Sequence, residues 1–222
     1  MKINPLIPSL SWVVGIAVQI LVLIETFQAE SSLLPQLISS GNSSPQLLGH
    51  QLIAELLPRL LPFLLTSFGV GLVVLVVVCF TLRYCLSQLT SFRSKALESA
   101  LQGNPVEVDA LKSQLSSISI RDPIQWPLLL GGVGAINQLV SLYSLELGGS
   151  TFELILSLAF LGLLLYLLYH VESTARRLHL LIPSGEVPER GLGLYVVLSI
   201  ITVGLFLIYW LYAVVKDVNA LA

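Results

Sequence analysis

Charged side chains are scarce in this chain. Only 11% of its 222 residues are Asp, Glu, Lys or Arg, whereas 55% are hydrophobic. A soluble domain carries about 25% charged residues, so this composition suits a solvent other than water. The net charge of −2, without a long basic tail, gives no indication of a nucleic-acid partner. We therefore predict an all-α integral membrane protein whose first partner is the lipid bilayer.

The side-chain sets that catalysis or metal binding needs are also missing. The three histidines are scattered along the chain, and His170 and Glu172 are two positions apart rather than at the i, i+4 spacing of a helical metal site. No Ser/His/Asp or Cys/His set gathers on one side of the membrane at one depth. No phosphate loop or dinucleotide fingerprint is present. We expect no metal, no cofactor and no catalytic residue, and we expect that the protein is not an enzyme.

Long apolar runs are abundant instead. A membrane-spanning helix needs about 20 mostly apolar residues, and five segments approach or meet this length. They cover residues 8–27, 61–82, 126–147, 152–169 and 192–215. The third is the weakest, because it contains Asn137, Gln138 and Glu146. One membrane domain, 1–222, then has an outer loop at 28–60, a cytoplasmic helical segment at 87–123 and a cytoplasmic loop at 170–191.

The positive-inside rule tests whether residues 126–147 span, because Lys and Arg collect on the cytoplasmic side. With five spans and a cytoplasmic N-terminus, nine Lys and Arg side chains are inside, and only Arg59 and Lys216 are outside. With four spans, seven Lys and Arg side chains are inside and four are outside. The rule favours five spans over four, and it places the C-terminus on the outer side.

The outer loop carries two further signals. The segment 46–57 is amphipathic and bounded by prolines, so we expect it to lie along the outer interface. Asn42-Ser43-Ser44 is a formal glycosylation sequon, a pattern that is common by chance. Glycosylation at Asn42 and the absence of modification both stay open.

The third span combines small residues with side-chain amides. Gly131 and Ala135 are four positions apart on one helical face, with Gly134 nearby, and Asn137 and Gln138 follow. Apolar burial does not drive helices together in lipid, so close backbone approach and hydrogen bonds must do so. We expect this span to be central in the bundle and shielded from lipid by the others.

Ionisable residues are nearly absent at mid-bilayer, where they usually mark an ion or proton path. The deepest polar groups are the neutral side chains of Gln19, Asn137 and Gln138. A polar face lined by these three residues and facing a cavity would indicate a transporter or channel. The alternative is that they serve only helix packing.

The cytoplasmic segment contains a second apolar pattern. A helix that begins at Pro105 carries four apolar residues spaced by three or four positions, which forms one stripe. These residues are Val108, Leu111, Leu115 and Ile118. The stripe either packs on the inner interface or the base of the bundle, or it is a docking face for a partner protein.

The C-terminal region resembles a known family. The quoted residues are Leu198-Ser199-Ile200-Ile201-Thr202-Val203-Gly204, then Ile208-Tyr209-Trp210-Leu211-Tyr212 and Lys216-Asp217-Val218-Asn219. This stretch, within residues 191–219, resembles an uncharacterised prokaryotic membrane family that is known only as a domain of unknown function. The resemblance implies a multi-pass membrane protein and no established activity. The aromatic residues at the helix exit are interpreted as an interfacial belt.

Two hypotheses of different classes follow. The first is a non-catalytic accessory, scaffold or assembly subunit of a larger membrane complex, with other membrane subunits as partners. The second is a small oligomeric transporter or channel. In both cases we expect a multi-pass protein of the cell membrane, most simply the prokaryotic cytoplasmic membrane.

Overall fold

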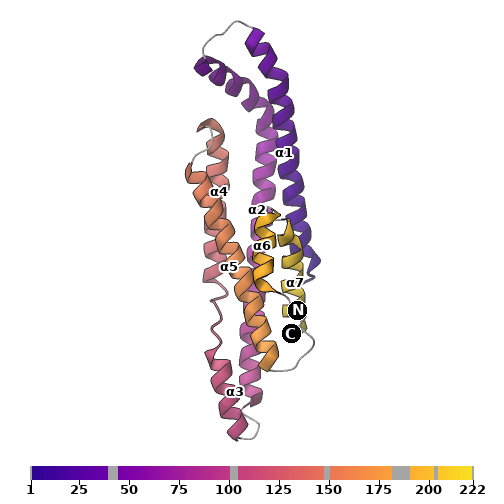
Figure 1. The fold of residues 1–222 in the computed structure, drawn as a ribbon, viewed down its shortest axis with the longest axis vertical. Helices are drawn as coiled ribbons and strands as arrows, with labels where there is room; N and C mark the ends of the chain where they lie inside the picture. The colour runs from indigo at the N-terminus through magenta and orange to yellow at the C-terminus, as the bar shows by residue number, and fades with distance from the viewer. Residues whose placement is uncertain are drawn as a thin grey trace.

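The computed structural model describes residues 2–39, 45–100, 105–147, 151–181, 191–202 and 205–221. Every regular element in these ranges is a helix, and the helices form one elongated bundle (Figure 1). In chain order they are α1 (Leu6–Ser39), α2 (Pro45–Ala100), α3 (Pro105–Ser117), α4 (Gln125–Leu147), α5 (Thr151–Leu181), α6 (Leu192–Ile201) and α7 (Phe206–Leu221).

Three of these helices are long and apolar enough to cross a membrane. They are the parts of α1, α2 and α5 that cover Leu6–Leu33, Ala54–Glu98 and Thr151–Leu181. Much of their apolar surface is open, since the side chains of Leu23 and Phe27 are each 72% exposed. Apolar side chains exposed in this way suit lipid rather than water. The chain is therefore an all-helical, membrane-embedded protein.

α2 is the axis of the bundle. It contacts α1, α3, α4, α5 and α7. Its buried residues recur every three or four positions, which gives one continuous apolar face; they include Val74, Val78, Leu82, Cys85 and Leu89.

The expectation that residues 126–147 are central is therefore wrong. Among the described residues, α4 contacts only α2 and α5. Its outer face is open, with Leu128 69% and Ile136 51% exposed. The physical reason is length: the 56 residues of α2 extend about 84 Å at 1.5 Å per residue, so α2 runs along the bundle and α4 packs on one side of it.

The helices also continue into segments that the sequence assigned to loops. α1 reaches Ser39 and α2 begins at Pro45, so most of residues 28–60 is helical, and α5 continues to Leu181. The first turns of α2, which include the segment expected at the outer interface, are inclined to the rest of the helix (Figure 1). α2 contains Pro58 and Pro62, which disrupt helical hydrogen bonding. Asn42 lies outside the described residues.

Residues 192–215 do not form one helix. The ring of Tyr195 in α6 lies 5.0 Å from that of Phe206 and 5.7 Å from that of Trp210 in α7, measured between centroids. In one continuous helix Tyr195 and Trp210 would be about 22 Å apart along the axis. α6 and α7 therefore fold back on each other as a helical hairpin (Figure 1).

Thr202 is the physical reason for the break. Its Oγ1 donates to the carbonyl oxygen of Leu198 at 2.7 Å and accepts from the amide N–H of Phe206 at 3.0 Å. The Thr202 hydroxyl thus caps the start of α7. A continuous span was expected because the apolar run shows no interruption in hydropathy here.

The hairpin brings the two chain ends together (Figure 1). Asn219 Nδ2 donates to the carbonyl oxygen of Ile3 at 2.7 Å, and Lys2 Nζ donates to the carbonyl oxygen of Asn219 at 2.9 Å. Tyr84 Oη on α2 donates to Asn219 Oδ1 at 2.8 Å. These contacts correct the expectation that the C-terminus lies across the membrane from the N-terminus.

This arrangement predicts the result of a topology experiment. A reporter that is active only in the cytoplasm, fused after Ala222, should give the same signal as one fused before Met1, because Asn219 holds both ends at one end of the bundle. A fusion placed within residues 40–44, between α1 and α2, provides the opposite-side control. Opposite signals from the two terminal fusions would contradict the hairpin.

Candidate functional site

A cavity of about 430 Å³ lies between α1, α2 and α4. Its lining includes the three neutral polar residues that the sequence singled out, Gln19, Asn137 and Gln138, together with Gly134. Among the described residues α1 and α4 do not contact each other, and each packs on α2. The cavity therefore occupies the space between two helices that share only α2 as a neighbour.

Glycines give the cavity its shape. A Cβ atom at Gly71 on α2 would lie 2.8 Å from Nε2 of Gln138, so a larger residue there would displace this amide. At Gly134 on α4 a Cβ atom would lie 2.6 Å from Cδ1 of Leu75 and 2.9 Å from Cε2 of Phe160. Real Cβ contacts are almost never this short. Gly71 and Gly134 therefore allow α4 to pack closely on α2 while an amide fits between them.

Two of the cavity's amides bind a neighbouring helix. Gln19 Nε2 on α1 donates to Ser67 Oγ on α2 at 2.9 Å. Ser157 Oγ on α5 donates to Asn137 Oδ1 on α4 at 2.9 Å. Such interhelical bonds each contribute about 0.6 kcal/mol within a bilayer. They position the two amides but leave part of each amide's hydrogen-bonding capacity unused.

Two other polar groups of the cavity are unpaired. Gln138 makes no hydrogen bond to any other residue of the described ranges, and the indole Nε1–H of Trp12 is buried without an acceptor there. An unsatisfied buried polar group costs about 1–3 kcal/mol, and lipid offers no compensating partner. The half-buried amide of Gln138 is therefore available to hydrogen-bond a molecule that enters the cavity, and Trp12 forms part of the wall.

The cavity is neutral and long. None of the described residues that line it is ionisable. Its lining on α1 runs from Trp12 to Leu23, which corresponds to about 16 Å along the helix axis. The site therefore suits an uncharged, elongated molecule with a few hydrogen-bonding groups. It offers neither a charged ligand for a metal nor a nucleophile with a base.

Gly131 and Ala135 lie elsewhere. They line a separate groove between α2 and α4, where a Cβ atom at Gly131 would lie 3.4 Å from Sγ of Cys79. The sequence grouped these small residues with Asn137 and Gln138. The structure assigns them to a different face of α4.

The apolar stripe of the cytoplasmic helix packs inside the chain. Leu115 is 0% and Ile118 is 4% exposed, and Leu111 packs against the same core. Arg93 Nη1 of α2 donates to the carbonyl oxygen of Ile118 at 2.8 Å, which ties this end of the stripe to α2. The side chain of Val108 lies outside the described set. The stripe thus packs on the base of the bundle, and its buried members are not available to a partner.

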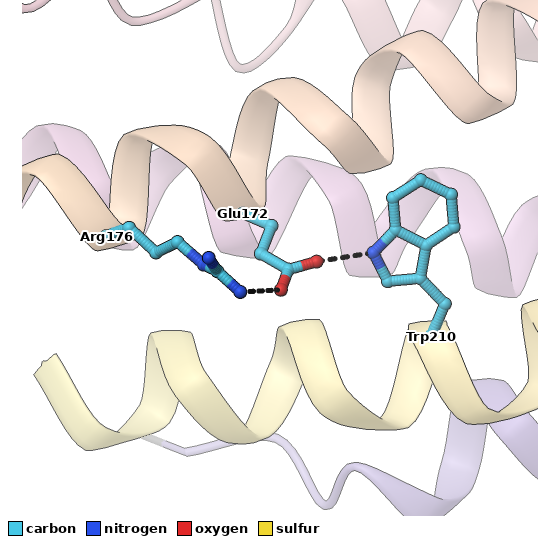
Figure 2. A network of polar contacts seen from close by, with 3 residues as sticks. All are labelled: Glu172, Arg176 and Trp210. Carbon is cyan, nitrogen blue, oxygen red and sulfur yellow. Dashed lines mark hydrogen bonds and ion pairs between the residues drawn. The ribbon is translucent and has the colours of Figure 1, made fainter. Parts of the chain in front are cut away.

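Sequence reasoning missed a buried polar network at the hairpin. Figure 2 shows the carboxylate of Glu172 on α5 between Trp210 of α7 and Arg176 of α5. Trp210 Nε1 donates to Glu172 Oε2 at 2.5 Å, and Arg176 Nη2 lies 3.4 Å from Glu172 Oε1. Glu172 is 1% and Trp210 0% exposed. The i, i+4 spacing of Glu172 and Arg176 was the available signal, but it does not reveal that α7 covers the pair.

The different surroundings of two neighbouring glycines predict opposite effects of alanine. Gly134→Ala should destabilise the protein by about 1–3 kcal/mol, because the new methyl group overlaps Leu75 and Phe160. Gly132→Ala is the matched control, since a Cβ atom there meets nothing within 4 Å. It should be neutral or stabilise the helix by up to about 1 kcal/mol. Unfolding in detergent measures both, and equal losses would contradict the packing described here.

The hairpin network predicts a measurable coupling. In a double-mutant cycle, Trp210→Phe and Glu172→Leu should be non-additive by about 1.5–3 kcal/mol, the range for a hydrogen bond to a charged group. Tyr209→Phe is the matched aromatic control, because Tyr209 is 49% exposed. The readout is the free energy of unfolding in mixed micelles. Additivity within about 0.5 kcal/mol would show that this bond does not hold α7 on α5.

No curated protein and no solved structure matches this chain. One family does match part of it. The matched segment, residues 190–222, contains both helices of the hairpin, and the family is described as Domain of unknown function (DUF4234).

Proposed function

We propose that this chain is a non-catalytic, multi-pass protein of the prokaryotic cytoplasmic membrane that binds and transports an uncharged amphiphile. The observation that carries the proposal is the cavity, in which the amide of Gln138 has no hydrogen-bond partner among the described residues. Of the two hypotheses drawn from the sequence, this is the transporter. The face that distinguishes it, lined by Gln19, Asn137 and Gln138, borders this cavity.

The proposed topology has four crossings, by α1, α2, α4 and α5, with the N-terminus inside. The 10 residues of α6 extend about 15 Å, half of a hydrocarbon core of about 30 Å. The hairpin therefore enters from the cytoplasmic side and returns to it. Lys216 is then on the inner side. Ten Lys and Arg side chains are inside and one is outside, compared with nine inside and two outside for five spans. The positive-inside rule supports this arrangement more strongly than five spans.

The chemistry of the ligand follows from the lining. A charged molecule would lose its hydration at a site without any ionisable partner, which costs several kcal/mol. A molecule with an apolar chain and a carbonyl or hydroxyl group at one end has no such penalty. A carbonyl or hydroxyl oxygen accepts from Gln138 Nε2, and the chain fits beside Ile16, Ile20 and Leu23.

A second candidate is the accessory subunit. One observation favours it: only 11% of the most apolar window of α1 is buried inside the chain. Within a larger complex this surface would contact another membrane subunit rather than lipid. Co-purification of a stable larger assembly in mild detergent, lost when Leu23 and Phe27 are replaced by tryptophan, would favour the accessory role.

The proposed function predicts the effect of one amide. Gln138→Leu keeps the approximate volume of the side chain but removes its hydrogen-bonding groups, so organic extracts of the purified variant should contain at least about fivefold less bound amphiphile, equivalent to about 1 kcal/mol. Gln114→Leu is the matched control, because Gln114 is exposed on α3 and far from the cavity lining. Mass spectrometry of the extracts quantifies the bound molecule.

A proteoliposome assay then separates binding from transport. With the extracted molecule as substrate, Asn137→Leu and Gln138→Leu should both slow its transfer, whereas Gln114→Leu should not. The proposal would be refuted if extracts of the wild type contained no more amphiphile than extracts of the Gln138→Leu variant. Binding without transfer would restrict it to a binding protein.

A further inference from the structure

A second recess lies between α2 and α4, and apart from Leu75 its lining residues differ from those of the amide-lined cavity. It encloses about 410 Å³, and its walls include Val76 and Phe80 of α2 and Leu128 of α4. These three side chains are 66%, 63% and 69% exposed. The recess is therefore an open apolar groove on the surface that the bundle presents to lipid, and we refer to it as the α2–α4 groove.

Small residues form the floor of this groove. Gly131 and Ala135 lie one helical turn apart on α4, and the nearest atom to a Cβ at Gly131 would be Sγ of Cys79 at 3.4 Å. Larger residues at these two positions would fill the space between the helices. The lining on α2 runs from Leu72 to Arg83, about 16 Å along the axis. This is close to the depth of one leaflet, half of a core of about 30 Å.

A cation closes one end of the groove. Arg83 is part of the lining and is exposed, and it makes no hydrogen bond or ion pair with another residue in the described ranges. Ile124, on the facing wall, lies between Arg121 and Trp126 in the sequence, and the guanidinium of Arg121 lies 4.9 Å above the ring of Trp126. Arginine over an interfacial aromatic ring marks the level of the lipid headgroups.

The only carboxylate adjacent to this wall in the sequence is already engaged. Asp122 Oδ1 accepts from the amide N–H groups of Gln125 and Ile124, both at 2.8 Å, and so caps the start of α4. These two hydrogen bonds lower the pKa of Asp122 below its ordinary value. Asp122 therefore serves the helix terminus and forms no ion pair with Arg83.

We infer that the α2–α4 groove binds an anionic phospholipid, with one acyl chain along Val76, Phe80 and Leu128 and the phosphate at Arg83. A guanidinium binds a phosphate group through paired N–H donors, which an ammonium group cannot do. The apolar groove alone accepts any acyl chain, so the free cation at its end provides the selectivity. The inference is independent of the ligand in the amide-lined cavity, because most of its residues are different.

The test compares two lipids with identical acyl chains. The full chain in mild detergent is titrated with phosphatidylglycerol or phosphatidylcholine, and bound lipid is counted by native mass spectrometry. The wild type should retain phosphatidylglycerol about fivefold more strongly, the contribution of one basic residue near an anionic lipid. Arg83→Gln should abolish this preference, and Arg83→Lys should restore only part of it. Lys95→Gln, which removes an exposed cation outside the groove, is the matched control.

A second variant tests the groove without changing any charge. Ala135→Leu should reduce the binding of both lipids, because the larger side chain fills the floor, and its unfolding transition reports whether the bundle remains intact. Equal retention of the two lipids by the wild type would overturn the inference, as would a loss with Lys95→Gln equal to that with Arg83→Gln. Displacement of the lipid by soluble glycerol phosphate would also overturn it, because the site would then bind a free phosphate.

Discussion

The close approach of α4 to α2 is the constraint on which the rest of this bundle depends. In a bilayer, apolar contact with a neighbouring helix is no better than contact with lipid, so helices associate only where backbones come close or polar groups pair. Gly71 and Gly134 provide that approach. Gln138 of α4 lies opposite Gly71, and Leu75 of α2 lies opposite Gly134. α1 lacks an equivalent contact with α4 and packs on α2 and α7 instead. The cavity is the direct consequence, because α2 and α4 are in close contact whereas α1 and α4 are not.

The same contact explains why the two recesses differ in chemistry. On the side of the α2–α4 contact that faces α1, α4 carries two amide side chains. On the other side of the contact it carries glycine, alanine and leucine. Gln138 and Asn137 therefore enter the space beside α1, whereas Gly131 and Ala135 border the surface beside Cys79. A polar recess within the bilayer needs partners for its amides, which Ser67 and Ser157 provide in part. An apolar recess needs none, and its character is set by the single charge of Arg83 at one end.

Sequence reasoning succeeded where the hydropathy and polarity of the local sequence decide the outcome. The extent of α4 was predicted within one residue, and Gln19, Asn137 and Gln138 were selected because they are the deepest polar groups. It failed where the path of the chain or the burial of a residue depends on one specific side-chain contact. The break at Thr202 depends on one hydroxyl group in an unbroken apolar run, and hydropathy cannot detect it. Glu172 was expected in the cytoplasmic loop 170–191, but it is buried against Trp210, which is 38 residues away and reaches it only because the chain turns back.

The hairpin itself requires polar anchors because its apolar surface cannot fix its position. α6 and α7 are short, and in lipid their leucines and valines would be equally satisfied at many depths and angles. Three groups remove this freedom: Thr202 sets the turn, Glu172 fixes the middle of the hairpin through Trp210, and Asn219 fixes its end against Ile3 and Tyr84. Each group joins α7 to a different neighbour, namely α6, α5 and the N-terminal segment with α2. A hydrogen bond in a water-poor environment is strongly directional and is costly to leave unmade, so these bonds define one position where apolar packing alone would allow many.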